Sequence, residues 1–177
     1  MDESESIIVQ AKENANNRDF YLEKVKNMPM LLEWASDEIK DDNEIVLEAV
    51  KTDPGALEFS SARLKDNKEI AITAVSAAGW TSCYLSERLK DDKDVIISAA
   101  KNDGQVLYFA SQRLRDDKDV VLEAVKNKPI ILKYASLRLR ADKDIAIAAI
   151  SKGKKKALEY ITDELKNDED ILKILEE

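Results

Sequence analysis

The sequence contains no histidine and only one cysteine, Cys83. Histidine is the commonest general base near neutral pH and the commonest metal ligand, so its absence argues against catalysis and against a metal site. One cysteine allows no internal disulfide and fits a reducing compartment such as the cytoplasm. Without a histidine or a clear basic pocket to activate it, Cys83 is expected to be an inert thiol. We therefore expect no catalytic residues, no metal and no cofactor.

The sequence also lacks long apolar runs and any segment typical of a linker. Its first residues, MDESESIIVQAKENA, are acidic with a short apolar run, which does not fit a secretory signal or a membrane span. No glycine- and serine-rich tract or shift in composition divides the chain, which predicts one domain over residues 1–177. The 28 basic and 36 acidic residues leave a net charge of -8, which favours a soluble protein and disfavours binding to nucleic acid backbones.

Most of the sequence consists of a repeat with a period of 25 residues. Its copies open with NNRDF at residue 16, DDNEI at 41, DNKEI at 66, DDKDV at 91 and 116, and ADKDI at 141. A fixed period between about 20 and 50 residues indicates a stacked array. We expect an N-terminal cap at 1–15, a C-terminal cap at 167–177 and six blocks between them: 16–40, 41–65, 66–90, 91–115, 116–140 and 141–166.

The first part of each block is predicted to be a helix that is buried on two sides. Its acidic opening, with Asp41 followed by Glu44, resembles a capping box and predicts the start of the helix. The apolar positions that follow cover an arc of about 200° at about 100° per residue, which is wider than a surface helix needs. In one block these positions are Val120, Val121, Leu122, Ala124 and Val125.

The second part of each block is predicted to be another helix, of about ten residues. The first helix should end where glycine can take a left-handed cap or proline can open the next helix. These ends are Pro29, Pro54, Gly79, Gly104, Pro129 and Gly153, and the packing face of one second helix is Leu132, Ala135, Ser136 and Leu139. One such hairpin cannot cover its own apolar surface. The predicted fold is therefore all-α, an α-solenoid-like array of about six 25-residue helical hairpins with end-capping helices.

The recurring pattern DDKEIVLEAVKNxGxALxYASxRLK resembles the domain of unknown function 4116 family, which consists of tandem helical repeats in bacterial and protist proteins. The resemblance covers residues 16–166 and departs most in the segments AAGWTSCYLS and GKKKALEYIT. It implies the helical-repeat fold. The family has no established activity, so the resemblance implies no catalytic residues.

The second helices carry a pattern at steps of four residues: an entry residue, an aromatic residue and usually an arginine. The trios are Met30, Trp34, Glu38; Gly55, Phe59, Arg63; Trp80, Tyr84, Arg88; Gln105, Phe109, Arg113; and Ile130, Tyr134, Arg138. In one interpretation the aromatic rings fill the interface between blocks and the arginines pair with acidic helix caps of a neighbouring hairpin. In the other, the stripe is a partner-binding groove.

The entry position favours the second interpretation, because it is large and apolar only in alternate blocks. Alternate packing of paired hairpins would give the same pattern. The candidate partner-binding residues are Met30, Trp80, Ile130, Arg63, Arg88, Arg113 and Arg138.

The predicted function is a non-catalytic scaffold that binds a protein or peptide, and its arginines would suit an acidic partner. One alternative is a structural subunit of a larger assembly, or an accessory part of a bacterial effector that acts in the host cytosol. A less favoured alternative is an RNA-binding repeat protein, for which Lys68, Lys93, Lys118 and Lys143 would supply positive charge. Neither a membrane, a small-molecule substrate nor a nucleic acid is expected as a partner.

Overall fold

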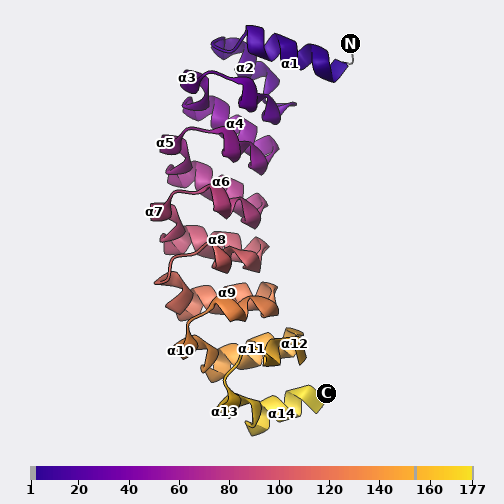
Figure 1. The fold of residues 1–177 in the computed structure, drawn as a ribbon, viewed down its shortest axis with the longest axis vertical. Helices are drawn as coiled ribbons and strands as arrows, with labels where there is room; N and C mark the ends of the chain where they lie inside the picture. The colour runs from indigo at the N-terminus through magenta and orange to yellow at the C-terminus, as the bar shows by residue number, and fades with distance from the viewer. Residues whose placement is uncertain (1–2, 154, 177) are drawn as a thin grey trace. The chain divides into compact units, whose positions relative to one another are not determined.

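The computed structural model describes residues 3–153 and 155–176, in which the regular elements are α-helices and short 3-10 helices (Figure 1). The predicted all-helical repeat array is confirmed. The chain divides into two compact units, Met1–Ser86 and Glu87–Glu177. The expectation that residues 1–177 form a single domain stays a prediction. Every described helix is too short or too polar to cross a lipid bilayer.

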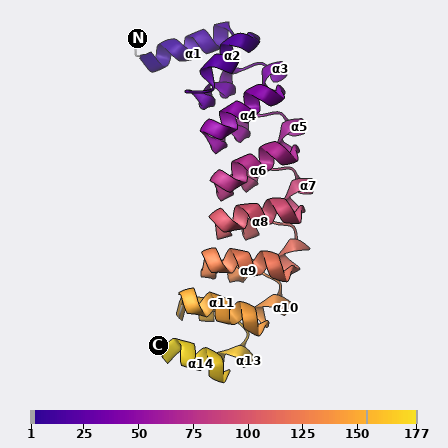
Figure 2. The ribbon, with the colours of Figure 1, turned by 180° about the vertical axis from the view of Figure 1, so that it is seen from behind.

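The first unit has two layers, one of longer α-helices and one of 3-10 helices. In the first layer α4 packs against both α2 and α6, and in the second η2 packs against both η1 and η3. Figures 1 and 2 show the same stacking from opposite sides. The elements are α1 (Glu3–Glu13), α2 (Arg18–Lys24), η1 (Pro29–Trp34), α3 (Asp37–Lys40), α4 (Asn43–Thr52), η2 (Pro54–Phe59), α5 (Ala62–Lys65), α6 (Lys68–Ala77) and η3 (Gly79–Tyr84).

The second unit repeats this arrangement. Helix α9 packs against α8 and α11, α11 packs against α14, and η6 packs against η4 and α12. The elements are α7 (Glu87–Lys90), α8 (Lys93–Asn102), η4 (Gly104–Tyr108), η5 (Leu114–Asp116), α9 (Lys118–Asn127), η6 (Pro129–Tyr134), α10 (Leu137–Arg140), α11 (Lys143–Gly153), α12 (Lys155–Leu158), α13 (Asp163–Lys166) and α14 (Glu169–Glu176).

The longer helices are buried on two adjoining faces, as their apolar arc predicts. In α9, Val120, Val121, Ala124 and Val125 are all fully buried. Because these positions are i, i+1, i+4 and i+5, they face both the neighbouring α-helices and the 3-10 layer, and α9 contacts both. Leu122 is only half-buried, so the buried arc is narrower than the sequence predicts.

The start of these helices lies one residue later than predicted. Asp42, not Asp41, is the N-cap of α4, and its Oδ1 accepts hydrogen bonds from the backbone N–H groups of Glu44 at 3.0 Å and Ile45 at 3.1 Å. Glu44 therefore lies one position too early for a capping box. Asp41 instead ends the preceding short helix, where its N–H bonds to the carbonyl of Asp37. Asp41, the first acidic residue of the pair, does not cap α4 and is therefore available for another contact.

The predicted second helix is not continuous. In one block it consists of the 3-10 helix η6, two residues with extended backbone, Ala135 and Ser136, and the short helix α10. The break follows from capping, because an N-cap residue has extended dihedral angles and Ser136 accepts a hydrogen bond from the N–H of Leu139 at 3.2 Å. The stripe with steps of four residues is therefore divided between two elements.

The glycine that ends α8 is needed for close packing rather than for a left-handed cap. The residue before it, Asp103, has extended backbone with φ -140° and ψ 109°, and Gly104 does not adopt a positive φ. A Cβ on Gly104 would lie 2.4 Å from the carbonyl oxygen of Ala124 in the next long helix. The prediction of a left-handed cap is wrong here, because the helix ends through an extended residue and glycine lets two blocks approach.

Leu132→Ala should reduce the free energy of unfolding by about 2 to 5 kcal/mol, because Leu132 is fully buried between the layers. Urea denaturation followed by circular dichroism would measure the loss. Leu137→Ala is the matched control, since Leu137 is 74% exposed and its truncation should change stability by less than about 0.5 kcal/mol. Equal effects of the two substitutions would contradict this description of the core.

Candidate functional site

Three of the candidate arginines are held by an aspartate of the same chain. The Nε of Arg63 lies 3.0 Å from both carboxylate oxygens of Asp41, and its Nη2 donates to the backbone carbonyl of Asp41 at 2.6 Å. The hydroxyl of Ser61 donates to the same carboxylate. We call this arrangement the Asp–Ser–Arg clamp. It recurs with Asp91, Ser111 and Arg113 and with Asp116, Ser136 and Arg138.

The clamp joins the end of one short helix to the beginning of the next. In the first unit, the N–H of Ser61 also bonds to the carbonyl of Lys40 at 2.9 Å, so α3 and α5 are joined by side-chain and backbone bonds. The hydrogen bond from Ser61, and next that from Arg63, hold the pKa of Asp41 below its usual value.

The last block has lost the clamp in all three of its positions. Ala141, Thr162 and Glu164 stand where the four blocks between residues 41 and 140 have aspartate, serine and arginine, after allowance for one extra residue. The N–H of Thr162 still bonds to the carbonyl of Arg140 at 3.3 Å, but its buried hydroxyl has no hydrogen-bond partner among the described residues. Ala141 cannot supply the carboxylate that accepts the serine hydroxyl in the clamps.

The clamp partly agrees with the first interpretation of the arginine pattern. The arginines pair with acids, but each pairs with the aspartate that opens its own block, and that residue is not a helix N-cap. The side chains of Arg63, Arg113 and Arg138 remain 62%, 61% and 64% exposed. Arg88 lies exposed in α7. Partner binding by these arginines stays a prediction.

Three of the four lysines that would serve an RNA-binding face bridge carboxylates of the segment that follows their own block. Lys93 lies 2.9 Å from Asp117 and 2.7 Å from Asp119. Lys118 and Lys143 are each paired in the same way with two aspartates, at distances of 2.7 to 2.9 Å. Each of these three ammonium groups is thus matched by two negative charges of the protein itself.

The apolar entry residues are all accessible. Met30, Trp80 and Ile130 are 44%, 47% and 38% exposed, and they lie on η1, η3 and η6. In the first unit the small entry residue has a packing role, because a Cβ on Gly55 would lie 3.3 Å from the ring of Trp80. The alternation therefore has a structural cause there: Gly55 leaves room for the large residue of the following block.

The aromatic residues of the stripe are half-buried. The ring of Tyr84 meets that of Trp80 edge to face, with 6.0 Å between centroids, and its hydroxyl donates to Glu58 at 2.9 Å. This bond and burial raise the pKa of Tyr84 to about 12. In the second unit Tyr108 and Tyr134 also meet edge to face at 5.0 Å. Tyr84 thus joins η3 to η2 through its hydroxyl, and Tyr134 joins η6 to η4 through its contact with Tyr108, which is not a residue of the stripe.

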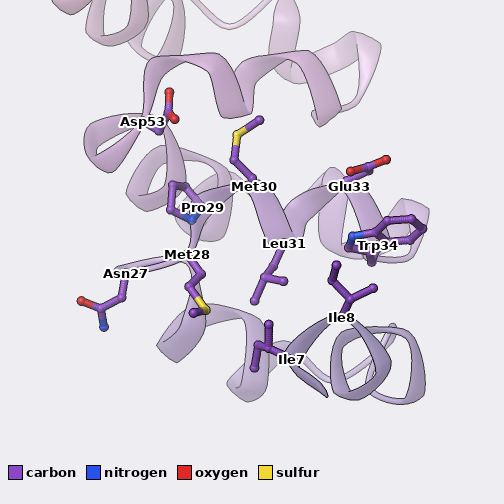
Figure 3. Close-up of a pocket in the computed structure, with 10 residues that line it drawn as sticks. All are labelled: Ile7, Ile8, Asn27, Met28, Pro29, Met30, Leu31, Glu33, Trp34 and Asp53. Atoms are coloured by element: carbon purple, nitrogen blue, oxygen red, sulfur yellow. The ribbon is translucent and has the colours of Figure 1, made fainter. Parts of the chain in front are cut away.

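A groove of about 440 Å³ lies beside Met30 in the first unit, between α1 and η1. Figure 3 shows Ile7 and Ile8 of α1 on one side and Met28, Met30 and Leu31 on the other. Its size lies in the range of pockets that bind ligands or partner side chains. Two methionines, which adapt to differently shaped apolar partners, are 47% and 44% exposed at its wall.

The polar residues of this groove are mostly acidic. Glu33 and Asp53 line it together with Asn27 and the ring of Trp34 (Figure 3). Asp53 accepts a hydrogen bond from the N–H of Gly55 at 2.8 Å, whereas Glu33 has no hydrogen-bond or ion-pair partner among the described residues. The groove therefore combines apolar walls with two carboxylates.

The sequence predicts Met30 as a binding residue but misses the rest of the groove. Ile7 and Ile8 belong to the segment expected to be only an end cap, and their packing on η1 is a long-range contact. The short apolar run within MDESESIIVQAKENA is the sequence feature that could have indicated this contact. Within the described residues no group of three acidic, histidine or cysteine side chains is placed to hold a metal ion.

A family model described as Domain of unknown function (DUF4116) matches residues 17–65, 67–115 and 117–155. These matches cover most of the chain, and the chain belongs to this family. Each complete match spans two 25-residue blocks, so Met30, Trp80 and Ile130 are equivalent residues of successive family repeats. No curated protein and no solved structure matches the chain.

Gly55→Leu should displace the Trp80 ring, because even a Cβ at this position would lie 3.3 Å from it. Fluorescence in a Trp34→Phe background would report Trp80 alone, since the chain has two tryptophans. We expect emission shifted to longer wavelength as the ring enters water. Gly55→Ala should give a smaller shift, and unchanged emission in both variants would contradict the packing described.

The clamp aspartates should make the protein sensitive to acid. Their pKa values are lowered first by the serine hydroxyl and then by the arginine. A lowered folded-state pKa adds stability that is complete above the unfolded value of about 3.9 and disappears as pH falls through the folded value. Asp41→Asn, Asp91→Asn and Asp116→Asn together should therefore lower the melting temperature at pH 7 and flatten its dependence below about pH 4.

Thermal unfolding at a series of pH values would test this expectation. Asp19→Asn serves as the control, because Asp19 makes none of the clamp bonds and its replacement should leave the acid dependence unchanged. Identical acid profiles for the parent and the triple variant would show that the clamps do not contribute.

Proposed function

We propose that this member of the family is a non-catalytic helical-repeat scaffold that binds a protein or peptide segment. The partner lies along the 3-10 face of the first unit and inserts an apolar side chain into the groove beside Met30. The observation that carries this proposal is the apolar groove between α1 and η1. The lack of histidine supports a non-catalytic role.

The face beside the groove suits an extended partner rather than a compact one. The three 3-10 helices η1, η2 and η3 pack side by side, and Met30 and Trp80 are exposed two blocks apart on this layer. Methionine, tryptophan and tyrosine are enriched at the centres of protein interfaces. A segment that crosses this layer can contact both side chains at once.

The charges argue for a protein or peptide rather than RNA. An RNA-binding face needs positive charge that is not already neutralised, because contacts to phosphate depend on the release of counterions. Lys93, Lys118 and Lys143 are each paired with two aspartates, and the net charge is -8. A salt-sensitive shift of RNA by the purified protein would contradict this choice.

Selection from a displayed library of random 12-residue peptides would test the proposal. We expect peptides that bind the parent and lose at least about tenfold in affinity with Met30→Asp, because a buried apolar anchor is typical of a hot spot. Leu137→Asp is the matched control: it also replaces an exposed apolar residue, which is 74% exposed in α10, and should retain binding.

The melting temperature of Met30→Asp should stay near that of the parent, since Met30 is 44% exposed. Failure to enrich any peptide, or binding that Met30→Asp leaves unchanged, would contradict the proposed function.

A further inference from the structure

We infer that the partner carries a lysine or arginine beside its apolar anchor, and that this cation is recognised by Glu33 and Asp53. The inference rests on the proposed function, because it names the chemistry of the segment that enters the same groove. It differs from the acidic partner that the arginine pattern predicts. The reason is that the clamp arginines are already paired with carboxylates of the protein, whereas Glu33 and Asp53 are not paired with a cation.

The arginines of the clamps are already neutralised by the protein. Arg63, Arg113 and Arg138 each hold a carboxylate of the chain at 3.0 to 3.1 Å. An acidic partner would have to compete with Asp41, Asp91 or Asp116 for the same guanidinium. These arginines therefore offer little net positive charge to a ligand.

The carboxylates of the groove are not neutralised in this way. Glu33 has no ion-pair or hydrogen-bond partner among the described residues, and Asp53 accepts its hydrogen bond from the neutral N–H of Gly55. No cation lines the groove among the described residues. The nearby Lys12 lies over the ring of Trp34 at 4.1 Å from its centroid and is not part of the lining.

The two carboxylates also lie where a residue next to the anchor would pass. In Figure 3 the side chain of Met30 lies between Asp53 and Glu33, and the isoleucines of α1 lie farther along the groove. An apolar side chain that packs against Met30 thus brings its chain neighbours close to these oxygens. A lysine or arginine there would gain a charge-assisted hydrogen bond, whereas an aspartate or glutamate would be repelled.

Conservative substitutions remove the negative charge of each carboxylate while nearly keeping the shape of its side chain. Asp53→Asn keeps an amide oxygen that can still accept the hydrogen bond of Gly55, and Glu33→Gln keeps the length of the side chain. Asp103→Asn is the matched control, because Asp103 accepts the equivalent bond from Gln105 at 2.9 Å but does not line the groove. All three variants should melt near the parent temperature.

The test uses the 12-residue peptides that bind the parent and lose affinity with Met30→Asp. We expect most of them to carry a lysine or arginine within about four residues of an apolar side chain. The double variant Glu33→Gln, Asp53→Asn should bind them about three- to thirtyfold more weakly, as two exposed ion pairs would give. Asp103→Asn should bind them as the parent does.

Salt provides an independent measurement. Binding to the parent should weaken as sodium chloride rises from about 50 to about 500 mM, because screening shortens the reach of exposed charges, and the double variant should respond much less. Groove-dependent peptides without basic residues, or equal affinity for the parent and the double variant, would overturn this inference while leaving the proposed function intact. Failure to select any groove-dependent peptide would overturn both.

Discussion

The fold depends on the burial of a helix that is apolar on two adjoining faces. Positions i, i+1, i+4 and i+5 of the longer helices, such as Val120, Val121, Ala124 and Val125 in α9, are fully buried. A single block supplies only one 3-10 helix and one short helix to cover them. The remaining face is covered by the long helices of neighbouring blocks, so the hydrophobic effect makes each block depend on the next within its unit. Close approach of the backbones is part of the same constraint, as Gly104 against Ala124 shows.

Polar contacts fix the register of this stack where the hydrophobic effect alone does not. The clamp connects residues separated by 20 and 22 positions, and the lysine bridges connect residues separated by 24 and 26, so both have a range close to one block. Each exposed ion pair of this kind contributes little to the free energy of unfolding, so their effect depends on their repetition and geometry. In the last block, where Ala141 replaces the clamp aspartate, the buried hydroxyl of Thr162 has no partner among the described residues.

The repeat period, the long helices and the two-sided core could be predicted from the sequence, since these depend on local periodicity. The sequence was not sufficient to decide which aspartate caps the helix, because Asp41 and Asp42 are chemically equivalent in the sequence. The choice depends on Ser61 and Arg63, which bind Asp41 across the block. The break at Ser136 follows a local rule that the pattern with steps of four residues concealed, since serine followed three residues later by a buried leucine is also typical of an N-cap. The groove could not be predicted from either segment alone, because Ile7 and Met30 line it together only through the packing of α1 on η1.

The two layers of each unit therefore differ in how far their residues are free to vary. In the α layer the fully buried apolar positions pack against neighbouring helices, and the aspartates at the starts of α9, α11 and α14 are matched by lysines of the preceding block. In the 3-10 layer the entry residue Gly55 is constrained, because it must leave room for Trp80. Its larger counterparts, Met30 and Ile130, are more than one third exposed, so a change there costs little stability while altering what the surface can bind. Repetition of the α layer maintains the fold, whereas exposed entry residues of the 3-10 layer such as Met30 and Ile130 contribute little to it.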